Sequence, residues 1–499
     1  MDFQLTLQPI TEVEADVLIV NLFEGVTALG GATGALDAAL DGQISALIAA
    51  GDLTGRFKET RTLYPFGKIK AQRVLVVGLG EREEFHVNRA RHIAAAAARA
   101  TREFKPTRIA TIVHGAGSGG LDVTAAAQAL AEGTVLGLYK VKTLKKHEAK
   151  ETLQSVLVVE NDASKEAAIQ QGLKRGLIIA QATNFSRDVI NEPANTLTPT
   201  RLAELATEVA NRHGLGIQVL EEAEMRELGM NALLGIGQGS DQPSKLIVIT
   251  HNGAPESEEK IAYVGKGITF DTGGYSMKPP AGMELMKTDM GGAGTVLGAM
   301  EAIGALKPKA NIMMVIPAAE NMVSGNAIKP GDVVVAMNGK SIEIVNTDAE
   351  GRVVLADALT WAVRNGATKI VDAATLTGAI SIALGRQVGG LFSNDTDWAA
   401  VVKEAFHQTG ERVWELPLVE EYSRQYNSNV ADMKNSGGRD AGSIVGAMIL
   451  REFVENTPWV HLDIAGTARD AEGTSDLHPK GATGFGVRTL VQLAENLGE

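Results

Sequence analysis

Short apolar runs recur along this sequence and set its secondary-structure pattern. Five runs in the second half are apolar enough to be central strands of a sheet that is covered on both faces. They are Leu246–Thr250, Ile261–Val264, Asn311–Ile316, Lys369–Ala373 and Trp459–Ile464. The glycine-rich turns around them are typical of an α/β region in which each strand leads into a helix.

The first third of the chain alternates strands and helices in the same way. Strands are predicted at Ala15–Val20, Arg73–Val77, Arg108–His114 and Ser155–Val159, and a helix at Arg89–Arg102. A chain of 499 residues is too long for one ordinary core. We therefore predict a smaller N-terminal α/β domain (1–160), a connecting helix (161–190) and a larger C-terminal α/β domain (191–499).

The composition excludes several kinds of site. The chain has 0 Cys, so it has no disulfide framework, thiolate metal ligand or cysteine nucleophile. The segment Met1–Gln4 does not open a signal peptide, and no apolar run approaches the roughly 20 residues of a membrane span. We therefore expect a soluble, cytoplasmic protein that has no membrane partner.

The excess of acidic over basic side chains is confined to the later part of the chain. Residues 1–160 contain 18 basic and 18 acidic side chains, so the net charge of -13 falls entirely on residues 161–499. An acidic half suits a bound cation, and it disfavours nucleic acid as the main partner without excluding it.

The segment Asn346–Arg352 places two carboxylates two residues apart and an arginine two residues later. In an extended backbone, residues i and i+2 point to the same side, so Asp348 and Glu350 are expected to share one small volume. Carboxylates that close repel each other unless a cation lies between them or one keeps its proton. The segment therefore indicates half of a metal site, with Arg352 as a fixed positive charge beside it.

A second polar cluster precedes that segment, at the glycine-rich turns after the strand Ile261–Val264. It contributes Lys266, Asp271, Lys278 and Asp289. The sequence has no histidine between His251 and His407, so a metal here would use carboxylate oxygens. A lysine could join them only as the neutral amine. Four carboxylates carry too much charge for one divalent ion and suit two.

Each of these residues also has an ordinary structural explanation. Asp271 is suited to capping a turn, Asp289 to capping a helix through Thr295–Ile303, and Asp348 to capping a helix through Val353–Val363. Arg352 is suited to a surface ion pair. The co-occurrence of carboxylates and lysines at glycine-rich turns favours the metal site.

Several motifs together resemble the leucyl aminopeptidases, the M17 cytosol aminopeptidase family. They are Asn346–Arg352 followed by Val353–Leu359, the cluster Lys266–Gly292, Asn191–Pro193 and Asp432–Ser436. The resemblance is specific from about residue 185 to the end and weak in residues 1–160. It implies a macro-like α/β N-terminal domain and a catalytic domain with a central mixed sheet.

The resemblance also implies a function and a role for each residue. The family releases N-terminal amino acids from peptides, Leu and other apolar residues foremost, by means of two divalent ions per subunit (Mn²⁺ or Zn²⁺) and a hydroxide that attacks the first peptide carbonyl. Asp271 and Glu350 would bridge the ions, Asp348 would complete the more exchangeable site, and Lys266 and Asp289 the tighter one.

Lys278 and Arg352 would be the catalytic pair, with Arg352 holding a bicarbonate ion as the general base. Met286, Thr375, Leu376 and Gly378 are expected to shape the substrate pocket, although ordinary core packing explains Met286 equally well. The family resemblance further implies a homohexamer.

Two alternative functions stay open at this point. Carboxylate-rich sites with two metals also hydrolyse phosphoesters, but such sites usually add histidines or several free arginines. The N-terminal domain is also a candidate for a regulatory role in DNA binding. Its even charge argues against strong DNA affinity, although Lys140–Lys150 is a local basic stripe.

Overall fold

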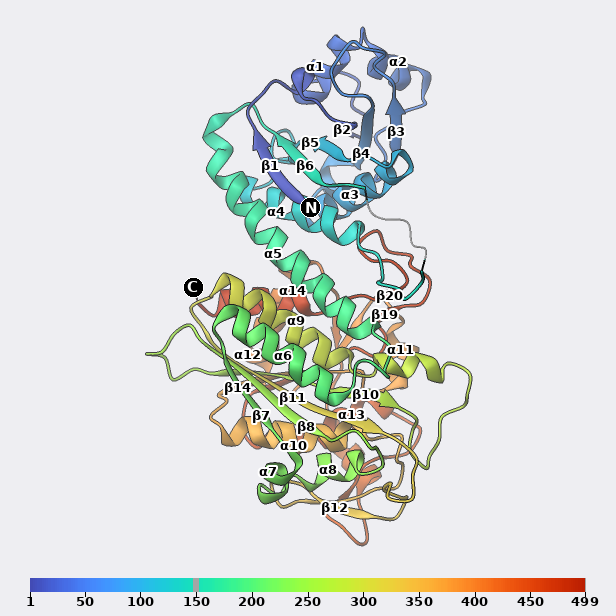
Figure 1. Ribbon diagram of the computed structural model, residues 1–499, viewed down its shortest axis with the longest axis vertical. Coiled ribbons are helices and arrows are strands. Elements are labelled where there is room, and N and C mark those ends of the chain that lie inside the picture. The colour runs from blue at the N-terminus through green and yellow to red at the C-terminus, as the bar shows by residue number, and fades with distance from the viewer. Residues whose placement is uncertain (147–151, 499) are drawn as a thin grey trace. The chain divides into compact units, whose positions relative to one another are not determined.

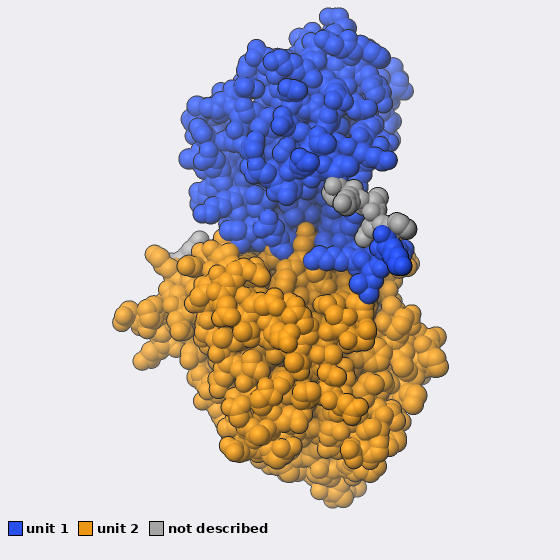
Figure 2. All heavy atoms as spheres, viewed as in Figure 1, with its two compact units in different colours: residues 1–181, 473–479 blue, residues 182–472, 480–499 orange. Residues whose placement is uncertain are grey.

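The computed structural model describes residues 1–146 and 152–498, so part of the basic stripe Lys140–Lys150 lies outside the described residues. The chain divides into two compact units, which Figure 2 shows in different colours. The N-terminal unit contains residues 1–181 and 473–479, and the C-terminal unit contains residues 182–472 and 480–499. The prediction of a two-domain α/β protein is confirmed.

The N-terminal unit is built on a six-stranded sheet in the order β1-β6-β5-β2-β4-β3. Its strands are β1 (Asp2–Thr6), β6 (Ser155–Val159), β5 (Arg108–Thr111), β2 (Val17–Phe23), β4 (Val74–Gly80) and β3 (Thr60–Leu63). Only β3, at the edge, pairs antiparallel with its neighbour. The carboxyl ends of the five parallel strands therefore lie along one rim of the sheet.

Helices cover both faces of this sheet, and the side chains of β2 point alternately to one face and the other. Leu18 and Val20 pack in the core with helices α1 (Gly31–Ala39) and α2 (Gln43–Ala50). Val17 and Ile19 pack in the opposite core with α3 (Val87–Thr101) and α4 (Val123–Gly137). Helix α5 (Glu166–Asn191) runs from this unit into the C-terminal unit as one continuous helix.

The C-terminal unit is built on a nine-stranded sheet with the order β16-β15-β18-β14-β9-β11-β8-β7, and β10 pairs with β11. The strands are β7 (Gly216–Leu220), β8 (Lys245–Asn252), β9 (Ile261–Gly265), β10 (Gly267–Asp271), β11 (Asn311–Asn321), β14 (Lys369–Ala374), β15 (Gly389–Ser393), β16 (Val413–Glu415) and β18 (Trp459–Asp463). The central strands β18, β14, β9 and β11 are parallel, whereas β15, β8 and β7 introduce antiparallel pairs. The predicted central mixed sheet is confirmed.

Helices cover this sheet on both faces (Figure 1). One layer holds α6 (Pro199–His213), α9 (Gly291–Leu306), α12 (Thr396–Thr409) and α14 (Val487–Asn496), and the other holds α8 (Asn231–Gly237), α10 (Gly351–Arg364) and α13 (Gly442–Arg451). The strands were predictable as continuous apolar runs because of this double cover: all residues of β9 and β11 are buried.

Shorter elements complete the C-terminal unit. They are α7 (Glu222–Glu227), α11 (Gly378–Leu384), a three-stranded sheet of β12 (Val333–Val335), β13 (Ser341–Glu343) and β17 (Met433–Lys434), and the pair β19 (Arg469–Asp470) and β20 (Gly481–Ala482). Among the described residues no helix is both long and apolar enough to cross a membrane.

The glycine-rich start of α9 lets this helix approach the sheet closely. A Cβ added to Gly292 would lie 1.9 Å from the carbonyl oxygen of Ala373 in β14. Only glycine permits this separation. The close approach brings the start of α9 against the carboxyl ends of β9 and β14, where the polar residues of the sequence motifs lie.

Candidate active site

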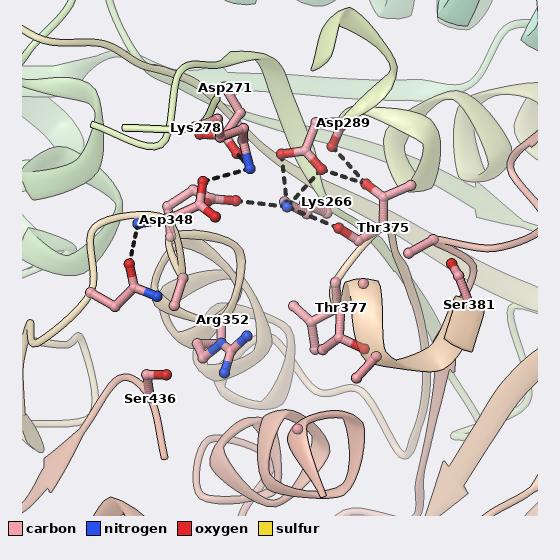
Figure 3. Close-up of a pocket in the computed structure, with 18 of the residues that line it drawn as sticks. Lys266, Asp271, Lys278, Asp289, Asp348, Arg352, Thr375, Thr377, Ser381 and Ser436 are labelled. Atoms are coloured by element: carbon pink, nitrogen blue, oxygen red, sulfur yellow. Dashed lines mark hydrogen bonds and ion pairs between the residues drawn. The ribbon is translucent and has the colours of Figure 1, made fainter. Parts of the chain in front are cut away.

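One cavity of about 480 Å³ in the C-terminal unit is lined by every catalytic, metal-ligand and pocket candidate from the sequence, and Figure 3 labels several of them. They are Lys266, Asp271, Lys278, Met286, Asp289, Asp348, Glu350, Arg352, Thr375, Leu376 and Gly378. Segments more than a hundred residues apart thus meet beyond the carboxyl ends of parallel strands, where ligand sites of open α/β sheets form.

Three of the charged side chains lie where a strand or a 3-10 helix ends or is interrupted. Lys266 lies between β9 and β10, Asp271 ends β10, and Asp289 follows the 3-10 helix Met283–Thr288. Glu350 directly precedes α10 and has helical backbone angles, φ -69 and ψ -34. The expectation of an extended Asp348–Glu350 segment was therefore wrong: a turn followed by a helix start brings these carboxylates together.

The first ion-pair group centres on Lys266, which is almost fully buried. Its Nζ lies 2.8 Å from both Asp289 oxygens and 2.7 Å from Glu350 Oε1, and it donates to the carbonyl oxygen of Thr375 at 3.1 Å. Burial alone would lower the pKa of Lys266, but the attraction of Asp289, Glu350 and Asp271 outweighs it and raises the pKa. Without a competing cation, this lysine is charged.

The second group centres on Lys278. Its Nζ lies 2.7 Å from Asp271 Oδ2 and 2.5 Å from Asp348 Oδ1. Burial opposes its charge, yet Asp271 and Asp348 raise its pKa above the usual lysine range. The Asp348 side chain is 34% exposed, compared with 2–9% for Asp271, Glu350 and Asp289, so it lies at the open side of the cluster.

The carboxylates themselves form a compact set of oxygen ligands. One oxygen each from Asp271, Asp348 and Glu350 can be chosen so that all three lie within 4.8 Å of one another. Burial raises the pKa of Asp271 and of Asp289, and the neighbouring negative charges raise both further. Such repulsion within a buried cluster is relieved by a bound cation.

Three carboxylate oxygens of the site have no hydrogen-bond partner among the described residues. Glu350 Oε2 is buried and has no polar partner among the described residues. Asp289 Oδ2 and Asp348 Oδ1 are close to a lysine Nζ but lack hydrogen-bond geometry. We take the short distances as ion pairs, because charge attraction has little angular requirement. An all-oxygen set with spare acceptors fits divalent cations.

The structure rules out the helix-capping explanations for Asp289 and Asp348. Helix α10 begins at Gly351 with Glu350 as its N-cap residue, and α9 begins at Gly291 with Met290 in that position. Asp271 does accept a hydrogen bond from the Gly273 amide at 2.8 Å, so its Oδ1 stabilises a turn while its Oδ2 contacts Lys278.

Arg352 lies in the first turn of α10 and is a buried side chain rather than a surface ion-pair partner. Burial lowers its pKa, and the nearby charges of Glu350, Asp463 and Asp348 oppose that shift. Its Nε has no hydrogen-bond partner in the part of the chain that the structure describes. A buried guanidinium with a spare donor, at a helix N-terminus, is suited to holding an anion.

The wall opposite the carboxylates is less polar. Thr375 and Leu376 lie between β14 and α11, and Gly378 is the first residue of α11. Met286 is half-buried and lines the cavity rather than filling the core. The Thr375 hydroxyl donates to Asp289 Oδ1 at 2.8 Å, which joins this wall to the metal-ligand candidates.

Three polar residues support the site. Two of them, Asn321 and Asp463, were missed at the sequence level, whereas Asn435 belongs to the motif Asp432–Ser436. Asn321, at the end of β11, donates to Asp271 Oδ1 at 2.8 Å and to the carbonyl of Thr347 at 2.9 Å. Asn435 donates to the Asn346 carbonyl at 2.6 Å. Asp463, at the end of β18, accepts the Thr377 hydroxyl at 2.6 Å. For Asn321 and Asp463 the only signal in the sequence was a polar residue at the end of a buried strand.

Comparison with known proteins identifies the family. Residues 184–491 match the cytosol aminopeptidase family, catalytic domain, and residues 19–148 match the same family's N-terminal domain. The chain is 43% identical over 500 residues, 100% of both chains, to a probable cytosol aminopeptidase of Alkaliphilus metalliredigens (strain QYMF). It is 41% identical to the probable cytosol aminopeptidase of Bacillus subtilis (strain 168), over 96% of each chain.

Solved structures agree with these sequence matches. The bottromycin maturation enzyme BotP in complex with Mn is 35% identical, with a TM-score of 0.87 over 97% of this chain and 100% of that one. A tomato leucine aminopeptidase mutant is 34% identical, with a TM-score of 0.89 over 99% of this chain and 96% of that one. With both domains matched and relatives aligned along its full length, the chain belongs to the cytosol aminopeptidase family.

Proposed function

We propose that this protein is a metal-dependent aminopeptidase that releases N-terminal amino acids, Leu and other apolar residues foremost, from peptides. The observation that carries the proposal is the buried set of carboxylates from Asp271, Asp289, Asp348 and Glu350 in one cavity. Membership of the cytosol aminopeptidase family and the likeness to a Mn-bound structure support it.

Two divalent ions, Mn²⁺ or Zn²⁺, would be held by the residues of the two ion-pair groups. Lys266 and Asp289 would complete the tighter site, in keeping with their deep burial, and the more exposed Asp348 would complete the exchangeable one. Asp271 and Glu350 would be ligands shared by both ions. When bound, such ions supply an activated water and a Lewis acid for the scissile carbonyl. Lys266 would have to lose its proton to become a ligand, so metal binding would release protons.

The chain's own residues would perform the remaining steps. Asp289 would accept hydrogen bonds from the free α-amine of the substrate, which an internal peptide bond lacks, so cleavage would be restricted to the N-terminus. Lys278 would donate to the oxyanion that develops on the carbonyl. Arg352 would bind bicarbonate, which would accept the proton of the attacking water in place of a histidine.

The wall of Met286, Thr375, Leu376 and Gly378 supports a preference for apolar side chains. Val445 and Ala465 line the same cavity and add apolar surface. In such a pocket each additional buried methylene contributes about 0.8 kcal/mol, so leucine should be favoured over alanine by roughly tenfold or more. A homohexamer and a cytoplasmic location are further proposals that rest on the family resemblance.

Two substrates distinguish this function from the alternative phosphohydrolase. The purified protein would be given leucine p-nitroanilide and p-nitrophenyl phosphate, each with Mn²⁺ and with a chelator. The proposal requires metal-dependent release of nitroaniline and negligible phosphate-ester hydrolysis. Faster hydrolysis of the phosphate ester would overturn it.

A further inference from the structure

The loop that joins β14 to α11, residues 375–377, lines the cavity of the C-terminal unit along its whole length. We call it the pocket loop, and Figure 3 labels Thr375 and Thr377 on it. A loop has no ladder of backbone hydrogen bonds of its own, so its position depends on contacts with neighbouring elements. The shape of this wall of the cavity therefore depends on what anchors the pocket loop.

Thr375 anchors the first end of the pocket loop to the carboxylate cluster. Its hydroxyl donates to Asp289 Oδ1 at 2.8 Å, and its carbonyl oxygen accepts from Lys266 Nζ at 3.1 Å. Both partners are metal-ligand candidates, so the residues that would hold the ions also set this end of the loop. The other end of the loop contacts a different carboxylate.

Asp463 anchors the second end of the pocket loop with both of its oxygens. It ends β18 and is 0% exposed. Its Oδ1 accepts from the amides of Leu376 at 3.3 Å and Thr377 at 3.4 Å, and its Oδ2 accepts the Thr377 hydroxyl at 2.6 Å. Oδ1 also accepts the amide of Ala465, another lining residue, at 3.2 Å. One buried carboxylate thus holds three residues that line the cavity.

The Thr377 hydroxyl has a single proton, and its neighbours determine where that proton lies. As a carboxylate, Asp463 can only accept, so the hydroxyl donates to it. The same oxygen therefore accepts from the Ser443 hydroxyl at 2.8 Å and from the Ile380 amide at 3.3 Å, which caps α11. The chain of hydrogen bonds runs from β18 through the pocket loop to α13.

Two buried cations act on Asp463. Burial raises the pKa of Asp463, and the charge of His461 and the hydrogen bonds from Thr377 oppose that shift. Burial alone would lower the pKa of His461, but Asp372, which accepts from its Nδ1 at 2.7 Å, and Asp463 raise it. Burial likewise lowers the pKa of Arg352, and Asp463 is one of the charges that oppose this. The other two are metal-ligand candidates, whose charge bound ions would compensate.

Helix α13 supports the pocket loop and Arg352 at the same turn. A Cβ added to Gly446 would lie 3.3 Å from Leu376 Cδ2, 3.3 Å from Thr377 Cγ2 and 3.8 Å from Arg352 Cζ. These three side chains therefore converge on one glycine of α13. Packing fixes the side chains of the loop on this face, while Asp463 fixes its backbone.

We propose, on the basis of the aminopeptidase function proposed above, that Asp463 is a positioning residue that sets the substrate side-chain preference by holding Leu376 and Thr377 in place. It acts through the pocket loop and does not touch the substrate. Without Asp463, the loop would keep its anchor at Thr375 and lose the one at Thr377. The metal site would then survive, while the pocket wall would no longer be held against the substrate's first side chain.

Two substitutions remove this anchor with little change in side-chain size. Asp463→Asn removes the charge, and Thr377→Val removes the hydroxyl. In both, the KM for leucine p-nitroanilide should rise by about tenfold and that for alanine p-nitroanilide by less than about threefold, because the longer side chain depends more on the wall. The kcat should change by less than about threefold, since the wall contributes binding that is uniform along the reaction. Thr377→Ser keeps the hydroxyl and should retain the KM of wild type.

The matched control is Asp37→Asn in the N-terminal unit. Asp37 has the same pattern of partners: its Oδ1 accepts the amides of Ile44 at 2.8 Å and Ser45 at 3.0 Å, and its Oδ2 accepts the Ser45 hydroxyl at 2.5 Å. This variant should lower the free energy of unfolding in urea and leave the preference for leucine over alanine unchanged. A loss of stability alone therefore does not reproduce the expected change in preference.

Calorimetric titration of leucine and alanine into the Mn²⁺-loaded proteins gives the same preference without turnover. A wild type that hydrolyses neither anilide would count against the proposed function, and the binding ratio would still test Asp463. Thr377→Val provides the same test if Asp463→Asn does not fold. The role of Asp463 is overturned if these variants keep the wild-type preference, if leucine and alanine weaken equally, or if Thr377→Ser behaves as Thr377→Val does.

Discussion

Replacing Asn321 by leucine separates a supporting role in the metal site from a role in stability alone. The side chain ties together the two segments that carry Asp271 and Glu350: its Nδ2 donates to Asp271 Oδ1 at 2.8 Å and to the Thr347 carbonyl at 2.9 Å. Leucine has a similar volume and no donor. The charge-assisted bond contributes about 1.5–3 kcal/mol and the neutral one about 0.5–1.5 kcal/mol, so stability should fall by roughly 2–4.5 kcal/mol.

The same change should weaken metal binding, because Asp271 loses the donor that orients its carboxylate. Residues that orient a ligand typically contribute 10–100-fold to metal affinity. Titration of Mn²⁺ into chelator-treated protein, with leucine p-nitroanilide hydrolysis as the readout, measures the concentration for half activity. We expect an increase of about 10–100-fold for Asn321→Leu.

Asn311→Leu is the matched control, since Asn311 begins the strand β11 that Asn321 ends. Its Nδ2 donates to three carbonyls, those of Ala254, Ser257 and Glu259, at 2.7–3.2 Å. Ten residues of strand separate the two by about 33 Å. Asn311→Leu should therefore lower the free energy of unfolding in urea and leave the Mn²⁺ requirement unchanged. An unchanged Mn²⁺ requirement in Asn321→Leu, or an equal shift in both variants, would refute the reasoning.

Further predictions concern Lys278 and Arg352, the proposed catalytic pair, and the N-terminal unit. Lys278→Met should lower kcat by about 10²–10³ with little change in KM, because its ammonium would act on the developing oxyanion; a change confined to KM would contradict this. Arg352→Ala should retain more activity than Glu350→Ala and should respond to added bicarbonate less than wild type does, and an equal loss would assign Arg352 a structural role. Burial lowers the pKa of His114 to about 4, so its neutral form is favoured in the fold. The stability that this histidine contributes is complete above pH 6.5, its unfolded pKa, and is lost as pH falls toward 4, at up to about 1.4 kcal/mol per pH unit. The variant His114→Gln should therefore show a weaker dependence of the free energy of unfolding on pH, as measured in urea.

The strands and the charged residues of the site were predictable for a physical reason. Strands such as β9 and β11 are buried on both faces, so they stand out as continuous apolar runs between polar turns. Lys266 and Asp271 lie at the ends of β9 and β10, and Asp289 follows a 3-10 helix; at each of these positions the apolar pattern of the sequence is interrupted by charge. Their shared position beyond one sheet edge follows from the parallel arrangement of the strands.

The local geometry of the site was not predictable in the same way. Asp348 and Glu350 were expected to converge through an extended backbone, whereas a turn and the start of α10 bring them together. Their separation by two residues fits either conformation, and the choice depends on packing of α10 against the sheet. Asn321 and Asp463 escaped notice because each is a single polar residue whose partners lie far away in sequence.

The central claim is that the carboxylate cluster binds two catalytic metal ions. The most direct test measures the number of bound ions and the activity on the same samples. Chelator-treated protein would be titrated with Mn²⁺, with bound metal and leucine p-nitroanilide hydrolysis followed on the same samples, for wild type and Glu350→Ala. The account predicts two ions per subunit in wild type, activity that rises as the second ion binds, and neither full occupancy nor activity in the variant. Hydrolysis by metal-free wild type, or a Glu350→Ala variant that keeps its activity, would contradict it.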